Sequence, residues 1–593
     1  MAPSARLGRS GIRVSARRFL LVPELGRSRG LGHIVRSFAL ASELDGEVAI
    51  VLPERPDTSK RTRAELLNTL LVDPIACEIV EAIEAGYDFI VFDQMRPSLS
   101  DLRKCEDAVT VGIDAGGEAR RFLSYLIDTL PNLERTPANT ASTRFLTPAK
   151  TKRSGFPDFL SSVLVSFGGS DPAGLTVPTV KSIVESSVGR SASVTAVWGP
   201  IAPRESLPVG VQVLDAPKDL REQLHMFDLV VTSFGLTAYE ALSANVPVAL
   251  VNPTAYHDAL SREAGFPTFG VGRRAARRVA GAEKKFGEIV TASRSLAPPK
   301  PIALSDALNA LAPEGVGGTS TYPVIARFRD RTYRRAPSGL IVMQRYSPSG
   351  IQYAESYFSD EYKKQYGRTY LDDFENIAAV AHERIDTIEQ VAPTGSSTTL
   401  LDIGCAYGPF LASAHERGYR VFGIDVAHEP VEYVKNTLGL RALSCDVRAF
   451  DPVVFGISAF DRVTMWYVIE HFAEIDEILR RVARLVAPGG VFAFSTPSAT
   501  GVSGRRDLER FLEISPADHF TVWSPRSAAR VLREYGFAVK KIRVTGHHPE
   551  RFAVSSTRLG ARKPVQYLLG IVSRVFGRGD TFEVYAVRTK ENP

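Results

Sequence analysis

Residues 399–411 of the chain read Thr399-Leu400-Leu401-Asp402-Ile403-Gly404-Cys405-Ala406-Tyr407-Gly408-Pro409-Phe410-Leu411. This order predicts a buried apolar strand, a turn of small residues and a helix that begins near the proline. Small side chains in such a turn let backbone amides approach a ligand closely at the helix N-terminus. The stretch therefore indicates a ligand site at the carboxyl end of a parallel strand in an α/β fold.

Three following strands extend the same expected sheet. The next strand ends at Asp425, 21 residues after Gly404, where a carboxylate suits the two hydroxyls of a ribose. A third strand ends before Asp446, and a fourth spans Phe460–Trp466. The turn lacks the third glycine that a pyrophosphate requires, so the pattern favours a nucleoside without phosphates.

These segments together resemble the class I methyltransferases that use S-adenosylmethionine (SAM), over roughly residues 344–588. The resemblance implies a Rossmann-like domain with a seven-stranded sheet, whose last two strands would be Val539–Val544 and an antiparallel Phe582–Val587. It also assigns the cofactor contacts: Asp402 orienting the turn, Gly404, Cys405, Ala406 and Gly408 along the methionine part, Asp425 at the ribose, Asp446 and Val447 at the adenine, and Trp466 beside the sulfonium.

Methyl transfer from a sulfonium is a direct displacement, so the protein must align donor and acceptor and remove a proton from a hydroxyl or amine acceptor. The candidates for that base are Glu470, His471 and His519. Each is equally open to a structural role as a helix cap or core partner. A carbon or carboxylate acceptor would require no base.

No metal is expected. Residues 331–343 resemble the end of a small zinc ribbon that precedes some sugar-modifying methyltransferases, but two cysteines are missing near residues 336–338. Since thiolates would hold the zinc, we expect a packing remnant without metal.

The amino-terminal half opens with a strand at Arg18–Val22 and a glycine-rich loop at residues 26–32. The loop delivers His33 to a helix N-terminus, where the helix dipole favours a neutral imidazole that can act as a base. A purely structural loop is the alternative. A second α/β unit carries two groups of small or hydroxyl residues suited to phosphates, Gly168, Gly169 and Ser170, then Ser233, Gly235 and Thr237, with Glu240 one helical turn further on in reach of a ribose.

Residues 18–312 resemble the GT-B superfamily, with two Rossmann-like lobes. The likeness is greatest to the UDP-sugar hydrolase of pseudaminic acid biosynthesis and weaker to the lipid-linked peptidoglycan glucosaminyltransferase. It implies that His33 is the base, that Gly32 and Arg36 shape its loop, and that Glu240 binds the ribose. Two departures are Phe234, in place of a usual glycine, and the segment 252–258, where His257 either contacts the substrate or caps a helix.

The 593 residues, 44% hydrophobic and 23% charged, exclude a disordered chain and suit several domains. We expect a basic tail at 1–17, GT-B-like lobes at 18–150 and 158–312, a linker with the ribbon remnant at 313–343, and the methyltransferase domain at 344–593. Within the last, 353–374 is either an aromatic lid or ordinary packing, and 546–580 has no assignment.

Four widely spaced cysteines and no apolar run of membrane-spanning length indicate a cytoplasmic protein. A net charge of +6, without a basic aromatic patch, gives little support for nucleic acid. We expect a bifunctional enzyme of bacterial surface-glycan or glycoprotein-sugar synthesis, which cleaves or transfers a nucleotide-activated sugar, a UDP-sugar first, and methylates a glycan or small molecule. One alternative makes the GT-B-like half a non-catalytic binding module, and another makes the whole chain a scaffold.

Overall fold

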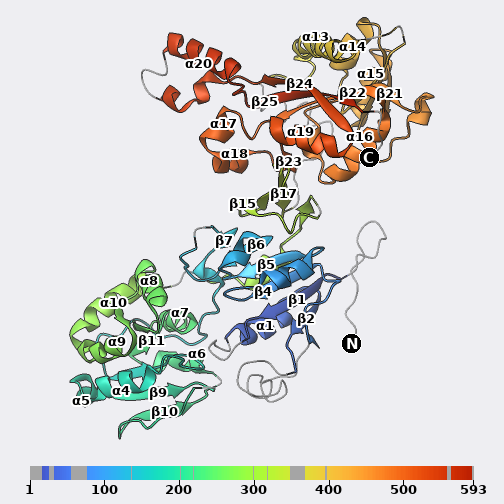
Figure 1. Ribbon diagram of the computed structural model, residues 1–593. Coiled ribbons are helices and arrows are strands. Elements are labelled where there is room, and N and C mark those ends of the chain that lie inside the picture. Colours follow the sequence, from blue (N-terminus) through green and yellow to red (C-terminus); the bar gives the residue numbers. More distant parts are fainter. Residues whose placement is uncertain are drawn as a thin grey trace. The chain divides into compact units, whose positions relative to one another are not determined.

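The computed structural model forms two compact units, residues 1–311 and 312–593 (Figure 1). It describes residues 16–25, 32–54, 77–134, 136–200, 202–217, 219–297, 300–316, 318–347, 367–393, 395, 397–556 and 562–589. Three predicted stretches lie wholly or mostly outside the described residues. They are the basic tail up to residue 15, the loop residues 26–31, and residues 353–366 of the aromatic segment 353–374.

The first unit begins with a parallel seven-stranded sheet in the order β3-β2-β1-β4-β5-β6-β7. Its strands are β1 (Arg18–Pro23), β2 (Glu47–Val51), β3 (Glu78–Val80), β4 (Phe89–Asp93), β5 (Val109–Ile113), β6 (Tyr125–Asp128) and β7 (Thr140–Ala141). Every residue of β4, β5 and β6 is buried, as expected for the continuous apolar strands of a parallel sheet covered on both faces. The helices of this part are α1 (Gly32–Glu43) and α3 (Leu99–Leu102).

A second parallel sheet of six strands follows, in the order β10-β9-β8-β11-β12-β13. Its strands are β8 (Ser162–Val165), β9 (Ser193–Trp198), β10 (Gln212–Asp215), β11 (Leu229–Thr232), β12 (Val248–Asn252) and β13 (Thr268–Val271). Its helices are α4 (Thr176–Val184), α5 (Val188–Ser191), α6 (Leu220–Gln223), α7 (Leu236–Ser243), α8 (Ala255–Glu263), α9 (Gly272–Arg278) and α10 (Phe286–Ser295). The next helix, α11 (Leu304–Asn309), returns to α1 of the first sheet, where Oγ of Ser305 donates a hydrogen bond to Glu43.

The second unit opens with a small antiparallel sheet where we expected a linker. Its strands are β14 (Glu314–Gly315), β15 (Val324–Phe328), β16 (Arg331–Arg335) and β17 (Ile341–Arg345), and β17 also pairs with β23 (Thr521–Val522). Tyr333, Ile341 and Met343 pack with Leu512 and Phe520 in one buried cluster. The segment expected as a linker with a packing remnant thus forms strands, and apolar residues of β16 and β17 are buried against the domain that follows.

The main sheet of the second unit has seven strands in the order β20-β19-β18-β21-β22-β25-β24. They are β18 (Thr399–Ile403), β19 (Arg420–Asp425), β20 (Arg441–Ser444), β21 (Phe460–Trp466), β22 (Val486–Pro497), β24 (Phe537–Thr545) and β25 (Thr581–Arg588). Only β25 runs against its neighbours β22 and β24 among these strands, which confirms the expected antiparallel last strand.

Helices cover both faces of this sheet (Figure 1). They include α13 (Phe374–Val391), α14 (Pro409–Glu416), α15 (His428–Asn436), α16 (Ile475–Leu485), α17 (Val502–Arg506), α18 (Leu508–Ile514), α19 (Pro525–Glu534) and α20 (Lys563–Val575). Among the described helices, none is both long and apolar enough to cross a membrane.

In all three parallel arrangements the first strand lies beside the fourth. These neighbours are β1 and β4, β8 and β11, and β18 and β21. Crossover connections leave in opposite directions at such a point, which opens a crevice at the carboxyl ends of the strands. The sequence-predicted sites lie at these three crevices.

Candidate functional site

The turn after β18 has the conformation that its glycines predict. Gly404 and Gly408 have positive φ angles of 75° and 78°. A Cβ on Gly404 would lie 2.5 Å from Cγ2 of Val468, so a larger residue does not fit there. Ala406, the residue in place of a usual glycine, also has a positive φ, 47°. Gly408 caps α14 without a side-chain hydrogen bond, which leaves amides of the first turn available to a ligand.

The carboxylate of Asp425 joins the end of β19 to this turn. Its Oδ2 accepts a hydrogen bond from the amide of Ala406, and its Oδ1 accepts one from the amide of Ala427, both at 2.9 Å. Burial raises the pKa of Asp425, and these amide bonds partly offset the rise. The two sequence-predicted features, the small-residue turn and the acidic strand end, are therefore in direct contact.

Asp402 lies beneath the turn. It is almost fully buried and accepts a hydrogen bond from Oγ1 of Thr464 at 2.6 Å. Burial raises the pKa of Asp402 from 3.8 to about 7, against the lowering effect of the Thr464 bond.

We expect Asp402 to make the stability of this domain depend on pH. A folded-state pKa above the unfolded value favours folding at low pH, and that contribution is lost as pH rises towards 7. At about 1.4 kcal/mol per pKa unit, the loss between pH 5 and pH 7 is ~2 kcal/mol, because half of the Asp402 carboxyls are still protonated at pH 7. Calorimetry should show the fall of the unaltered chain reduced by this amount in Asp402→Asn, while the part due to Glu470, whose pKa is also raised to about 7, remains. Glu432→Gln, which changes an exposed carboxylate of the same domain, should leave it in place; an identical fall in Asp402→Asn would contradict the assignment.

The side chains of the other residues expected at the cofactor point in different directions, some towards solvent and some into the core. Asp446 is partly exposed and pairs with Arg448, whose hydrogen bond lowers the pKa of the Asp446 carboxyl. Val447 is buried in the main core, so its side chain points away from the crevice. Cys405 is likewise buried, and its Sγ lies 2.7 Å from where a Cβ on Gly423 would be, inside the sheet. Its side chain has a packing role, and backbone atoms would make any ligand contact there.

Trp466 ends β21 beside the turn and packs towards the helices. Its ring centroid is 5.1 Å from that of Phe410, and the guanidinium carbon of Arg384 lies 4.2 Å from the ring. Its indole Nε1 is buried without a hydrogen-bond partner.

The three candidate bases, which are 49 residues apart at most in the sequence, come together. Glu470 and His471 lie in the short η9 turn (Ile469–His471) after β21, and His519 precedes β23. The imidazole rings of His471 and His519 meet edge to face at 4.7 Å, and Nδ1 of His471 lies 3.1 Å from Oδ2 of Asp518. Glu470 is 1% exposed, and its Oε2 has no hydrogen-bond partner.

The pKa values of the three side chains in this cluster shift in different directions. Burial raises the pKa of Glu470 to about 7. Burial would lower the pKa of His471, but Asp518 and Glu470 outweigh it and raise that pKa. Burial and the charge of His471 lower the pKa of His519 to about 3, so this ring stays neutral at physiological pH. A carboxyl with a pKa near 7 is suited to exchange a proton at neutral pH.

The same three side chains could also hold a metal ion. One ligand atom from each of Glu470, His471 and His519 lies within 4.8 Å of the others. Carboxylate and imidazole donors suit Zn²⁺ and related divalent ions. The expected absence of a metal stays a prediction, which the experiment on Glu470 below addresses.

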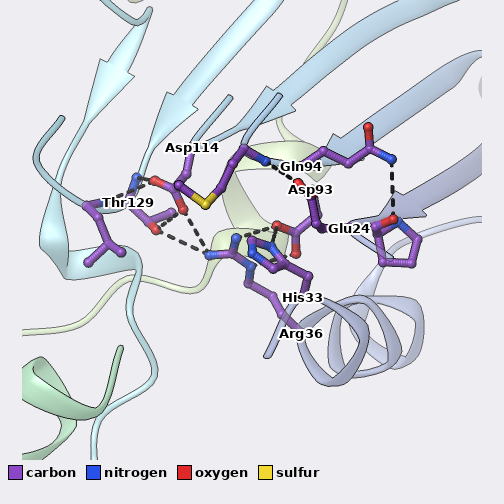
Figure 2. Close-up of polar contacts among 10 residues, drawn as sticks. Glu24, His33, Arg36, Asp93, Gln94, Asp114 and Thr129 are labelled. Carbon is purple, nitrogen blue, oxygen red and sulfur yellow. Dashed lines mark hydrogen bonds and ion pairs between the residues drawn. The ribbon is translucent and has the colours of Figure 1, made fainter. Parts of the chain in front are cut away.

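In the first unit, His33 belongs to a network of polar residues at the carboxyl edge of the first sheet (Figure 2). Its Nδ1 lies 2.6 Å from Oδ1 of Asp93, the last residue of β4. Arg36 contacts both oxygens of Asp93, with its Nε donating to Oδ2 at 2.8 Å. Nη1 of Arg36 also donates to Oδ2 of Asp114 at 3.1 Å, and Asp114 accepts hydrogen bonds from Thr129.

This network fixes the state of the His33 ring. Burial would raise the pKa of Asp93, but Arg36 and His33 outweigh it and lower that pKa to about 2, so Asp93 is an anion at neutral pH. An aspartate at Nδ1 keeps the ring proton there and leaves Nε2 as the proton acceptor. Sequence reasoning found His33 and Arg36 but missed Asp93, Asp114 and Thr129. A signal existed, because Asp93 and Asp114 each follow an apolar strand run directly.

The two phosphate-binding turns expected in the second sheet differ in whether a side chain already occupies the helix N-terminus beside them. The carboxylate of Asp171 accepts hydrogen bonds at 2.9 Å from the amides of Leu175 and Thr176, so it occupies the N-terminus of α4 next to the 168–170 turn. α7 has Gly235 at its cap, with no side-chain hydrogen bond and open space around the Cβ position. The 233–237 turn is therefore the better anion site of the two.

Three further residues around α7 have defined surroundings. Phe234 is buried against the rings of Tyr239 and Phe266. Its side chain therefore faces the core and does not line the carboxyl edge of the sheet. Glu240 is partly exposed, and burial raises its pKa. His257 makes the interaction of a cap: its Nδ1 lies 2.7 Å from Oγ1 of Thr254, which caps α8.

The starts of α1 and α7 meet within the first unit. A Cβ on Gly32 would lie 3.4 Å from Cδ1 of Leu236, which places the loop of His33 beside the open N-terminus of α7. A cavity of about 260 Å³ lies at the same edge of the first sheet, lined by Met95, Arg96, Asp114, Gly116, Asn132, Glu134 and Tyr256. Asp114 links this cavity to the network around His33.

Comparison with known proteins identifies the second unit. A family model described as a methyltransferase domain matches residues 375–542. The ubiquinone biosynthesis O-methyltransferase of Burkholderia pseudomallei is 29% identical over 168 residues, 26% of this chain and 72% of that protein. Its namesake from Thiobacillus denitrificans is 26% identical over 206 residues, 33% of this chain and 87% of that protein.

Solved structures give partial matches. A SAM-dependent methyltransferase from Archaeoglobus fulgidus matches at 16% identity and a TM-score of 0.28, covering 38% of this chain and 98% of that one. Geranyl diphosphate C-methyltransferase from Streptomyces coelicolor matches at 17% identity and a TM-score of 0.26, covering 36% and 76%. The family model and the sequence relatives show that the chain carries a SAM-dependent methyltransferase domain of class I in its carboxy-terminal part.

Proposed function

We propose that the chain joins two enzymes: a SAM-dependent O-methyltransferase in the second unit, and a GT-B-like nucleotide-sugar hydrolase or glycosyltransferase in the first. Both activities would serve the cytoplasmic synthesis of a bacterial surface glycan or a glycoprotein sugar. The observation that carries the first activity is the contact between Asp425 and the 404–408 turn. The observation that carries the second is the pair of His33 and Asp93 beside the open end of α7.

The crevice at β18 and β19 fits SAM by its chemistry. The left-handed glycines leave room for the amino-acid part of the cofactor, and the carboxylate of Asp425 would accept hydrogen bonds from its ribose. Asp446 and the backbone at Val447 would lie along the adenine, and Trp466 would flank the reacting end. When bound, SAM supplies an electrophilic methyl group. The chain's own task is then to orient the acceptor and take its proton.

We propose a hydroxyl acceptor because the sequence relatives are O-methyltransferases by name. Glu470 is the group that would take the hydroxyl proton, since its unpartnered Oε2 has a buried position two residues from Val468, which touches the glycine turn. His471 would hold Glu470 in place, and the neutral His519 would orient the acceptor.

Methyl transfer should rise with pH through about 7, as Glu470 loses its proton. Glu470→Gln should remove this step and lower the rate by about 10²–10⁴-fold, the usual range for a general base. The measurement is the initial rate with labelled SAM and candidate hydroxyl acceptors from pH 5 to 9. Glu477→Gln, a carboxylate on α16 of the same domain, is the control and should keep the profile.

A chelator separates the base from a metal. We expect transfer to survive EDTA, because the proposed role of Glu470 needs only its carboxylate. Loss of transfer with EDTA and its return with a divalent cation would assign the cluster to a metal and contradict the base.

In the first unit, Ser233, Gly235 and Thr237 would bind the diphosphate of a nucleotide sugar at the N-terminus of α7, and Glu240 would bind the ribose. Nε2 of His33 would take a proton from water or from an acceptor hydroxyl as it attacks the sugar. Arg36 and Asp93 would hold the ring. Attack on the anomeric carbon breaks its bond to the diphosphate oxygen, so UDP is the leaving group with either acceptor. Incubation with UDP-sugars tests this: free UDP with free sugar identifies a hydrolase, free UDP with a new glycoside identifies a transferase, and binding without turnover would identify a non-catalytic module.

A further inference from the structure

α20 presents an apolar face to solvent. The helix lies in the segment between β24 and β25, beyond the helices that cover the sheet (Figure 1). Tyr567 and Val575 are each 71% exposed, Phe576 is 68% exposed and Leu568 is 59% exposed. Ile571 and Val572 are exposed as well. These six positions recur every three to four residues, so they form one stripe over about half of the helix circumference.

The opposite side of α20 contains Ser573 and faces the protein. Ser573 is fully buried, and its Oγ lies 2.7 Å from Nδ1 of His547, at the end of β24. The carbonyl of Ser573 accepts a hydrogen bond from the amide of Arg578. A helix that served only the core would bury its large apolar residues. This helix buries a serine and leaves six such residues outside, so its apolar face is built for contact with something else.

The surrounding charge indicates the partner. Residues 551–579 contain no aspartate or glutamate and six basic residues, Arg551, Arg558, Arg562, Lys563, Arg574 and Arg578. Lys563 lies one turn before Tyr567 on the helix, and Arg574 lies about two turns after it, so both border the apolar stripe. Long basic side chains beside an apolar helix face, with aromatic residues in that face, are typical of helices that lie in the headgroup region of an anionic bilayer.

We propose that α20 docks this protein on an anionic lipid surface, with the stripe from Tyr567 to Phe576 among the acyl chains and the flanking cations at the headgroups. A second copy of the chain fits less well. Two such faces packed together symmetrically would bring basic side chains next to each other, with no acidic residue between 551 and 579 to compensate. The inference is independent of the proposed activities.

The test is vesicle binding by the full chain. We expect co-sedimentation with vesicles of phosphatidylcholine and phosphatidylglycerol, at least tenfold weaker binding to phosphatidylcholine alone, and a decrease with added salt. The double variant L568Q/F576Q should bind the anionic vesicles at least tenfold more weakly. The control V453Q/I514Q removes two other exposed apolar side chains of the same unit and should bind as the unaltered chain does.

Both double variants change exposed residues, and retained SAM binding would show that the domain is folded. If L568Q/F576Q were misfolded, Lys563→Glu with Arg574→Glu would test the same surface through its charge and should abolish the preference for anionic vesicles. Three results would overturn the proposal: no binding to anionic vesicles, equal binding by L568Q/F576Q, or a dimer that this variant dissociates while vesicles stay unbound.

Discussion

Asp425→Ala should weaken SAM binding at least a hundredfold while leaving the domain folded. A carboxylate that accepts hydrogen bonds from two ribose hydroxyls contributes about 1.5–3 kcal/mol for each bond, and about 1.4 kcal/mol corresponds to tenfold in affinity. The alanine also removes the acceptor for the amides of Ala406 and Ala427, so the 404–408 turn loses its connection to β19. Both effects act on the same site.

The measurement is SAM affinity by calorimetry or equilibrium dialysis on the full chain. Asp386→Ala is the matched control, because that carboxylate is exposed on α13 and pairs with Arg417 away from the turn. Its SAM affinity should match that of the unaltered chain. An unchanged affinity in Asp425→Ala, with the unfolding transition intact, would remove Asp425 from the cofactor site and with it the main support for the proposed SAM geometry.

Local sequence pattern was sufficient to place the candidate sites at the carboxyl edge of each parallel sheet because of the topology. An apolar strand followed by small or acidic residues marks the carboxyl edge of a parallel sheet, and ligands bind where the first and fourth strands are neighbours. The 404–408 turn follows β18, and the 233–237 turn follows β11. Both strands lie at such a point. The last two strands of the second unit were expected from the family resemblance, since Lys540, Lys541 and Arg543 interrupt the apolar pattern of β24.

Local pattern does not say which side chains meet. His33 and Asp93 are 60 residues apart and come together only because β1 pairs with β4. Cys405 lies in the expected turn, yet its side chain enters the sheet. The 168–170 turn has the right residues for a phosphate, but Asp171 takes the helix end beside it. In each case a partner distant in sequence, or the direction of one side chain, decides the outcome.

Composition alone does not show how the expected linker and ribbon remnant pack. Glycine, serine and threonine at 313–321 suggest an unstructured connection. The residues that follow place Val324, Tyr333 and Ile341 on strands that need a partner to bury them. That partner is the methyltransferase domain itself, through β23 and α18.

His33→Gln should abolish sugar-nucleotide cleavage, with the rate lowered by about 10²–10⁴-fold, because Nε2 is the proposed proton acceptor. Asp93→Asn should lower kcat by a similar factor, because Asp93 acts on the reaction through the imidazole ring of His33. An asparagine no longer stabilises the imidazolium that forms when Nε2 takes the proton, and it no longer fixes the ring proton at Nδ1. Asp93 is a positioning residue, so KM for the sugar nucleotide should change little.

The distinguishing readout is the split between kcat and KM for the sugar nucleotide. Asp93→Asn should lower kcat of the folded protein and leave KM close to that of the unaltered chain, because Asp93 acts on the ring of His33 and not on the substrate. Asp101→Asn, which changes a partly exposed carboxylate on α3 that pairs with Lys104, should alter neither kcat nor KM. A merely structural Asp93 would lower the free energy of unfolding and leave kcat of the folded protein unchanged. Full activity in His33→Gln would remove His33 from the reaction and leave its pair with Asp93 as a structural contact.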